Sequence, residues 1–286
     1  MEKKERKKLK LRWWTVIVII LALVLAWWFG NYTIKLNRTA YMTEKVSSRF
    51  RIAVISDLHY HSSGLGSTDI LEKIGAADPD MVFVLGDMYT TGSPQADIDG
   101  AADVTKSIAA DGYPTYFVSG EHDTDADYLA GLEAAGVNVM NYKSSILDVK
   151  GNKVQLIGID NAYYSPTFDL TNEFTVDRDC FSILLAHIPN YERFAAFRTD
   201  LTICADTHGG MVQLPFGLGP VISPDTGEWF PKLLSDATVF DKGWFQYPGG
   251  AMFITSGLGD SPYPVRINNR PEVVVMDILP EKEGNT

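Results

Sequence analysis

Five short apolar runs, each followed directly by acidic or histidine side chains, constrain the fold of this chain more than any other feature. Short apolar runs of this kind are typical of strands buried in a parallel sheet. Because the carboxyl ends of parallel strands meet at one edge of a sheet, we expect the side chains that follow them to form one site. The runs are 51–56, 81–85, 113–119, 181–186 and 201–205, and they are followed by Asp57-Leu58-His59, Gly86-Asp87, Gly120-Glu121-His122-Asp123, His187 and Asp206-Thr207-His208.

Helical patterns separate the first runs, and the resulting alternation of strand and helix predicts crossover units in a parallel sheet. Further along, two strand patterns are joined by Gly151-Asn152, which indicates a hairpin. We therefore predict an α/β fold, a two-sheet β-sandwich flanked by helices, formed by one domain over residues 49–286. The expected helices are 68–77, 95–110, 125–135 and 191–197, and the further strands are 144–150, 153–159, 252–256 and 272–279.

The N-terminal region differs from the rest. Residues 1–12 carry seven Lys or Arg side chains, and residues 13–30 are almost wholly apolar between two Trp pairs. As a helix, those 18 residues extend for about 27 Å, close to the thickness of a hydrocarbon core, and Trp is favoured at both membrane interfaces. We expect a basic cytoplasmic tail (1–12), one transmembrane anchor (13–30), a tether (31–48) and an extracytoplasmic domain of a single-pass protein in the cell membrane. A cleaved signal peptide and a buried helix of a soluble protein are the alternatives.

The charge outside the tail is strongly acidic. The whole chain has 25 basic and 36 acidic side chains, and without residues 1–12 there remain 18 basic against 34 acidic. Nucleic-acid binding needs basic surface to meet the phosphate backbone. We therefore expect no nucleic-acid partner.

Four of the five histidines follow the apolar runs, interleaved with three aspartates. Carboxylates and imidazoles are ordinary ligands of divalent cations, and one carboxylate can bridge two of them. The fifth histidine, His61, fits none of the motifs. The pattern predicts a metal site made of Asp57, His59, Asp87, His187, Asp206 and His208, with His122 close by.

These motifs resemble those of the calcineurin-like metallophosphoesterases, over about residues 51–279. The tail Ser256-Gly257-Leu258-Gly259, with Pro264-x-Arg266 and Asn269-Arg270-Pro271-Glu272, is similar to that of membrane-anchored or exported bacterial members. The resemblance implies the metallophosphoesterase fold and hydrolysis of a phosphate mono- or diester by a hydroxide that bridges two metal ions.

The resemblance also implies roles for individual residues. One ion would be held by Asp57, His59, Asp87 and His208, and Asp87 would bridge to a second ion held also by Glu121, His187 and Asp206. Two of these depart from the family pattern, since Glu121 stands where the family has Asn and Asp206 where it has His. His122, paired with Asp123, matches the family's acid, which protonates the leaving group or steadies the phosphoryl oxygens.

Both replacements fall on the second ion, and both are oxygen ligands. Oxygen-rich shells favour harder ions, so we expect two divalent ions, with Mn²⁺ preferred and Mg²⁺, Fe or Zn²⁺ as alternatives. Four carboxylates also make the centre more negative, which acidifies a bound water less. This predicts either an alkaline optimum for hydrolysis or a trivalent second ion. The alternative is that the second site is degraded, which would leave a non-catalytic or weakly active metal-binding envelope protein.

The motifs do not specify the substrate. Arg266 and Arg270 are candidate substrate-binding residues, because a guanidinium matches a phosphate, and structural ion pairing is the alternative. The aromatic clusters at 229–231 and 244–247 would cover the site, contact an acyl chain or pack the second sheet. The expected anchor favours a lipid-linked or cell-envelope phosphoester. A third functional hypothesis is a metal-dependent hydrolase that acts on a substrate other than a phosphoester.

Overall fold

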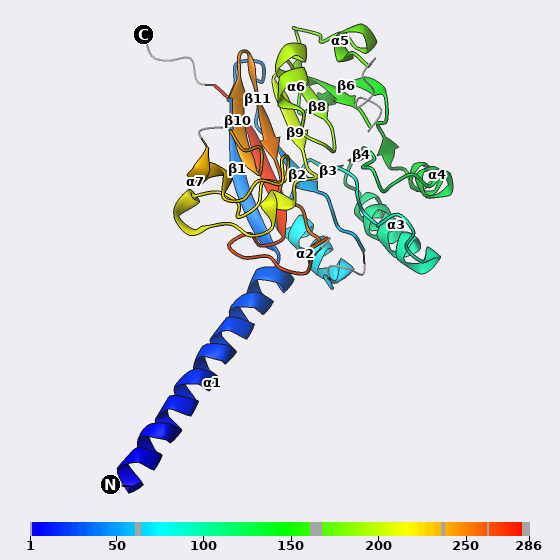
Figure 1. The fold of residues 1–286 in the computed structure, drawn as a ribbon. Coiled ribbons are helices and arrows are strands. Elements are labelled where there is room, and N and C mark those ends of the chain that lie inside the picture. Colours follow the sequence, from blue (N-terminus) through cyan, green and yellow to red (C-terminus); the bar gives the residue numbers. More distant parts are fainter. Residues whose placement is uncertain (1, 61–63, 161–167, 236–237, 262, 282–286) are drawn as a thin grey trace.

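Two six-stranded sheets packed face to face form the body of the protein (Figure 1). The structure is a computed structural model that describes residues 2–60, 64–160, 168–235, 238–261 and 263–281, and His61 lies outside this range. Helices flank both sheets. The architecture confirms the predicted two-sheet fold with helices outside.

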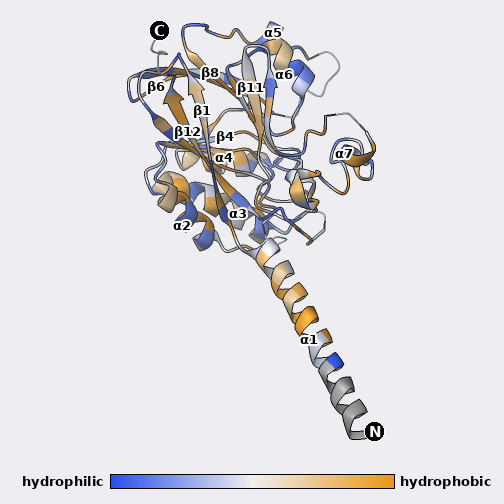
Figure 2. Cartoon of the chain, turned by 90° about the vertical axis from the view of Figure 1, so that its left-hand side faces the viewer, coloured by the Kyte–Doolittle hydropathy of each residue, from blue (hydrophilic) through white to orange (hydrophobic). Residues whose placement is uncertain are grey.

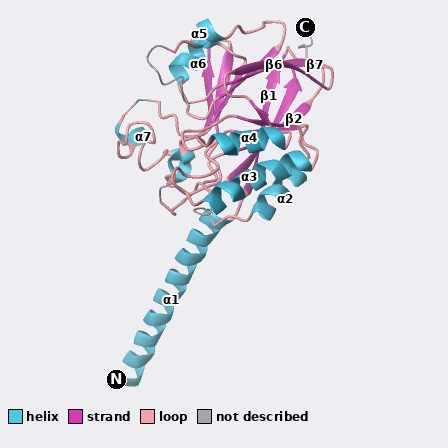
Figure 3. Cartoon of the chain, turned by 90° about the vertical axis from the view of Figure 1, so that its right-hand side faces the viewer, coloured by secondary structure: helices cyan, strands magenta, loops and turns pink. Residues whose placement is uncertain are grey.

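The first sheet has the strand order β1-β12-β2-β3-β4-β5. Strands β2 to β5 are parallel to one another, whereas β12 runs antiparallel to β2 and parallel to β1. The connecting helices lie together over its outer face (Figure 3). The elements are β1 (Lys35–Thr43), β2 (Phe50–Ile55), α2 (Ser67–Ala77), β3 (Met81–Val84), α3 (Gln95–Ala110), β4 (Thr115–Phe117), α4 (Ala126–Ala134), β5 (Asn138–Val139) and β12 (Glu272–Pro280).

The second sheet has the strand order β10-β11-β9-β8-β7-β6. The predicted hairpin is β6–β7, and β7, β8, β9 and β11 are parallel. Strand β10, which the sequence analysis does not predict, forms an antiparallel edge beside β11. The elements are β6 (Lys143–Val149), β7 (Asn152–Gly158), α5 (Leu170–Glu173), β8 (Phe181–Leu185), α6 (Tyr191–Phe197), β9 (Leu201–Cys204), the short helices η2 (His208–Gly210), η3 (Pro215–Gly217) and α7 (Pro231–Leu234), β10 (Gly243–Tyr247) and β11 (Gly250–Ile254).

Alternate residues of the buried strands supply two different cores. In β3, Phe83 points into the core between the sheets, where it joins Phe181 and Ile183 of β8. Its neighbours Val82 and Val84 belong to the core beneath the helices. Both faces of these strands are therefore buried, which explains why their sequences are continuously apolar rather than alternating.

The expected tether is wrong for most of its length. Residues 35–43 form β1, which pairs with β12 from Lys35↔Glu272 to Thr43↔Pro280. The strand has no apolar run because it lies at the edge of the sheet and its side chains alternate between half-buried and exposed. The domain therefore begins at Lys35 rather than at residue 49.

Helix α1 (Glu2–Tyr32) projects from the body as one long helix (Figure 2). Residues 12–32 are long and apolar enough to cross a membrane, although a signal sequence near an N-terminus would meet the same criterion. Only Thr33 and Ile34 separate this helix from β1. The orientation of α1 is therefore tied closely to that of the first sheet.

Candidate metal centre

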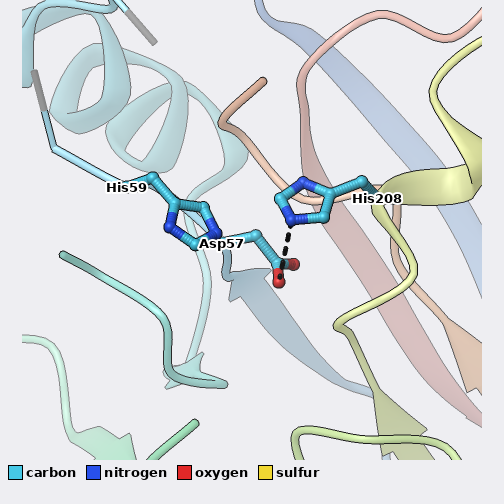
Figure 4. A group of neighbouring side chains, drawn as sticks. All are labelled: Asp57, His59 and His208. Atoms are coloured by element: carbon cyan, nitrogen blue, oxygen red, sulfur yellow. Dashed lines mark ion pairs between the residues drawn. The ribbon is translucent and has the colours of Figure 1, made fainter. Parts of the chain in front are cut away.

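All seven side chains expected as metal ligands meet at one edge of the two sheets, in the turns that follow β2, β3, β4, β8 and β9. Their ligand atoms fall into overlapping groups in which every atom lies within 4.8 Å of the others. Figure 4 shows one group, in which the two imidazoles flank the carboxylate of Asp57. The groups are Asp57, His59 and His208; Asp57, Asp87 and His187; Glu121, His187 and Asp206; and His59, Asp87 and His122.

The backbone is strained at most of these positions. Non-glycine residues rarely adopt positive φ, and such strain is concentrated at functional sites. Here five of the candidate ligands have positive φ, with values of 49° at Asp57, 43° at His59, 52° at Asp87, 68° at Asp206 and 47° at His208. The abrupt turn at each strand end directs its side chain back towards the others.

Gly86 and Gly120 allow two of these turns to approach each other. Gly86 has a φ of 79°, and a Cβ atom at this position would lie 2.1 Å from the backbone nitrogen of Gly120. A Cβ on Gly120 would lie 2.1 Å from Oδ1 of Asp87. Glycine is therefore required at both positions for the turns after β3 and β4 to meet.

The first group is deeply buried. The carboxylate of Asp57 is fully inaccessible and accepts hydrogen bonds from Ser56 Oγ at 2.6 Å and from Asp206 N at 3.2 Å. Nε2 of His208 lies 4.0 Å from Asp57 Oδ1. Burial lowers the pKa of His59 to about 4 and that of His208 well below its usual value. Both rings are therefore neutral near pH 7 and have a lone pair that can bind a cation.

The group formed by Glu121, His187 and Asp206 contains both residues that depart from the family pattern. His187 is buried, and its Nε2 lies 3.2 Å from Asp87 Oδ2 and 3.8 Å from Asp206 Oδ1. Its Nδ1 is 2.5 Å from the carbonyl oxygen of Leu85, which can only accept, so the ring donates from Nδ1. Burial lowers the pKa of His187, but the negative charges of Asp87, Asp57 and Asp206 outweigh this effect and hold the pKa well above its usual value, so Nε2 carries a proton in the metal-free protein. Loss of this proton on metal binding would give Nε2 the lone pair that a metal-binding histidine with this backbone contact needs.

The donor set fits divalent cations. Burial raises the pKa of Asp57 to about 6 and that of Asp206 to about 7, because their charges are held close together away from water. Within the described residues, neither Nε2 of His187 nor Nδ1 of His208 has a hydrogen-bond partner, although both are buried. Cations would neutralise the carboxylates and take the place of the proton on Nε2 of His187.

His122 lies at the mouth of the centre. Its Nε2 is 3.9 Å from Asp87 Oδ2, and its Nδ1 accepts a hydrogen bond from the backbone N–H of Thr91 at 3.1 Å. Thr91 Oγ1 lies 2.9 Å from the same nitrogen. Because Nδ1 accepts, the proton of the neutral ring is on Nε2, where it can be donated towards the site.

The expected pairing of His122 with Asp123 is wrong. Asp123 is buried, and its carboxylate accepts hydrogen bonds from the backbone N–H groups of Asp87 at 2.5 Å, Gly120 at 2.9 Å and Met88 at 3.1 Å. It therefore ties together the turns after β3 and β4 and so positions the Asp87 carboxylate. The ring of His122 is held by Thr91 instead.

The expected substrate-binding role of Arg266 is also wrong. This residue is fully buried, and its guanidinium donates to the backbone carbonyl groups of Ser256, Gly259 and Asn269. Arg270 lies against α1, where its guanidinium carbon is 4.3 Å from the ring centre of Phe29 and its Nε donates to Thr33 O. Neither residue has a described contact with the candidate ligands.

Two threonines have roles that the sequence analysis misses. Oγ1 of Thr90 lies 3.0 Å from Nδ1 of His59, and the adjacent Thr91 holds His122. Each hydroxyl fixes the ring of one histidine from the side opposite the metal centre. No local pattern marks them, because both contacts depend on how the turns after β2 and β4 pack against the segment after Asp87.

Comparisons with known proteins identify the family of the chain. A family model for calcineurin-like phosphoesterases matches residues 50–211. The chain is 27% identical over 243 residues to the uncharacterized metallophosphoesterase YkuE of Bacillus subtilis (80% of this chain, 79% of that one) and 25% identical over 268 residues to the phosphodiesterase YaeI of Escherichia coli (87% and 89%). Among solved structures, that of NAD nucleotidase from Haemophilus influenzae matches with a TM-score of 0.45 and 15% identity, covering 73% of this chain but only 45% of that one. With more than half of its length matched by the family model, the chain belongs to the calcineurin-like phosphoesterase family.

Proposed function

We propose that this protein is a membrane-anchored, metal-dependent phosphoesterase that hydrolyses a phosphate mono- or diester. The observation that carries the proposal is the position of Asp87 Oδ2. It lies 3.2 Å from Nε2 of His187 and 3.9 Å from Nε2 of both His59 and His122. One carboxylate oxygen is thus shared between the two groups of candidate ligands and the residue proposed as the acid.

In this proposal the residues around Asp87 hold two divalent cations. Asp57, His59 and His208 serve the first cation, and Glu121, His187 and Asp206 serve the second. When bound, such a pair stabilises the charge on a phosphoryl group and lowers the pKa of a bound water. The oxygen-rich second group supports Mn²⁺ as the preferred ion, with Mg²⁺, Fe and Zn²⁺ as alternatives.

His122 acts on the substrate's leaving group, and two further residues position other groups of the site. His122 presents the N–H of Nε2 to the centre, and we propose that this group protonates the leaving oxygen. Thr91 keeps the ring in the donating tautomer. Asp123 is a positioning residue, since it acts through the backbone of Asp87.

The location proposed for the enzyme is the cell membrane, with residues 1–12 in the cytoplasm and the body on the other side. The apolar stretch of α1 and its basic N-terminal flank support this orientation. The last turn of α1 is hydrogen-bonded to the body through Trp27 and Asn31, which supports a retained helix rather than a cleaved signal. A phosphoester of the envelope, including a lipid-linked one, is the substrate class that such a location favours.

The test uses the full chain in detergent with 4-nitrophenyl phosphate and bis(4-nitrophenyl) phosphate. Hydrolysis is expected with Mn²⁺ and should stop with a chelator. Asp87→Asn should lower kcat/KM by about 100-fold or more, since even residues that only support ligands contribute 10–100-fold. Metal binding without any hydrolysis would contradict the proposal and favour the non-catalytic alternative.

The role of His122 is tested by changing the leaving group. His122→Ala should lower kcat by about 10²–10⁴-fold for phenyl phosphate, whose leaving group needs a proton. The loss should be much smaller for 4-nitrophenyl phosphate, because nitrophenolate is a stable anion. An equal loss for both substrates would show that His122 steadies the phosphoryl oxygens instead.

A further inference from the structure

An apolar pocket of about 480 Å³ opens beside the candidate metal centre. Asp206 and His208 form part of its wall, so the pocket is continuous with the residues that would hold both cations. The rest of the wall is largely apolar and includes Met211, Val221, Ile222, Trp229 and Val265. Its size lies within the usual range for a small-molecule site, roughly 300–1,000 Å³.

Large apolar side chains around this pocket are exposed to solvent. Tyr263 and Trp229 line the pocket and are 71% and 61% exposed, and Ile222, also in its wall, is 42% exposed. We call the set Ile222, Trp229, Tyr263 and Val265, all of which line the pocket, the apolar face. An exposed apolar surface of this kind usually marks a site of contact with a ligand, a protein or a membrane.

The apolar face lies near the C-terminal end of the candidate membrane span. Nε1 of Trp27 in α1 donates to the carbonyl of Pro264 at 3.1 Å, directly between Tyr263 and Val265. In Figure 2, α7 lies at one side of the body, between the end from which α1 leaves and the opposite end.

Strand directions place the metal centre at the end of the body from which α1 leaves. Strand β12 is antiparallel to β2, and β1 is parallel to β12, so β1 begins where β2 ends. Lys35, three residues beyond α1, therefore starts at the sheet edge that carries Asp57. A helix embedded in a bilayer would hold the metal centre and the apolar face towards that bilayer.

We propose that the pocket binds an alkyl chain of a phosphoester lipid lying in the bilayer that α1 crosses, with the phosphoryl group at the metal centre. The inference rests on the proposed function and specifies its substrate class. An aqueous substrate would gain nothing from the apolar face. For a lipid, the exposed side chains of the apolar face enter the membrane interface. The pocket then holds the alkyl chain between the bilayer and the metal centre, shielded from water.

The first test measures how KM depends on alkyl chain length, with methyl, octyl and dodecyl diesters of 4-nitrophenyl phosphate. In the full chain, KM should fall by at least about tenfold from methyl to dodecyl, because each buried methylene favours binding. Ile222→Asp and Val265→Asp, which place a charge at the pocket, should bring this KM ratio close to one. The matched control is Ile146→Asp on β6, an apolar residue that is 60% exposed away from the pocket and should keep the full ratio.

Two results would overturn the inference. One is a parent enzyme whose KM is independent of chain length, and the other is a control variant that loses the ratio equally. Absence of hydrolysis of all three diesters would refute the proposed function instead. In that case calorimetry with dodecyl phosphate and methyl phosphate still tests whether the pocket binds an alkyl chain. Only dodecyl phosphate should bind the parent tightly, and Ile222→Asp should weaken this binding.

A second test asks whether the lipid comes from the enzyme's own bilayer. The dodecyl diester is placed either in liposomes that contain the full chain or in separate liposomes mixed with them. Hydrolysis should be at least tenfold faster in the first arrangement. Equal rates would mean that the substrate reaches the pocket through water, contrary to the inference.

Discussion

The side chain of Asn31, in the last turn of α1, makes two hydrogen bonds to the backbone of Arg266. Its Nδ2 donates to the carbonyl of Arg266 at 3.3 Å, and its Oδ1 accepts from the backbone N–H at 2.6 Å. The guanidinium of Arg266 in turn holds the carbonyl of Gly259, whose N–H donates to the carbonyl of Asp57. A continuous set of contacts therefore joins α1 to a candidate metal ligand.

Arg266→Lys should destabilise the protein. Three backbone carbonyl groups lose their donor, and a lysine cannot reach all of them, so the free energy of unfolding should fall by about 3 kcal/mol. Urea unfolding with a chelator present measures this directly. Arg270→Lys is the control, because Arg270 is only partly buried, and it should cost much less. If Arg266→Lys changed only the KM for substrate, the structural role assigned here would be incorrect.

Asp123→Asn should also act through stability. The carboxylate accepts three backbone hydrogen bonds in a buried position, and an amide would turn a donor towards at least one of those N–H groups. The expected loss is about 2–3 kcal/mol in metal-free protein, as for a buried hydrogen bond to a charged group. An unchanged unfolding midpoint combined with slow turnover would instead support a direct partnership with His122.

Thr90→Val and Thr91→Val should differ in effect although the residues are adjacent. Thr90 orients His59, so its loss should weaken metal affinity by about 10–100-fold. Thr91 orients His122, so its loss should lower kcat for phenyl phosphate while metal affinity stays the same. Metal titration by calorimetry, together with steady-state kinetics, separates the two. Similar changes in both quantities for both variants would argue against separate roles.

Restoring the family residues at the second site should change metal preference. The double variant Glu121→Asn with Asp206→His removes two carboxylates and adds a nitrogen ligand, which favours Zn²⁺ over Mn²⁺. A less negative centre should also acidify the bound water more, so the pH optimum for hydrolysis should move down. Activity with each metal across pH values measures both. A pH optimum that stays in place would refute the charge argument.

Removal of metal should lower thermal stability, because the buried carboxylates of Asp57, Asp87 and Asp206 then repel one another. At 100-fold excess over the dissociation constant, one bound ion contributes about 2.7 kcal/mol. For a domain of this size the melting temperature should therefore fall by about 5–10 °C on chelation. Calorimetry of the full chain with and without Mn²⁺ measures this shift without relying on activity. Asp87→Asn, the matched control, should show a smaller shift.

The amino-acid sequence alone determined the elements that carry the site. Helices α3 and α6 begin and end where their patterns predict, because their periodicity and end signals lie within one continuous segment. The central strands can likewise be predicted from their own residues, since a strand buried on both faces must be apolar at every position. The candidate ligands follow from this, because they come directly after those strands.

Only the tertiary structure decided which partner each polar side chain meets. Strand β1 has no apolar run of its own and forms only by pairing with β12, more than 200 residues later. Asp123, Arg266, Thr90 and Thr91 likewise bond to groups brought close by folding, and their roles could not be read from their neighbours in the chain. The apolar pocket depends in the same way on residues 206–229 and 261–265 meeting beside α1. Local patterns specify elements, whereas long-range packing assigns what each side chain contacts.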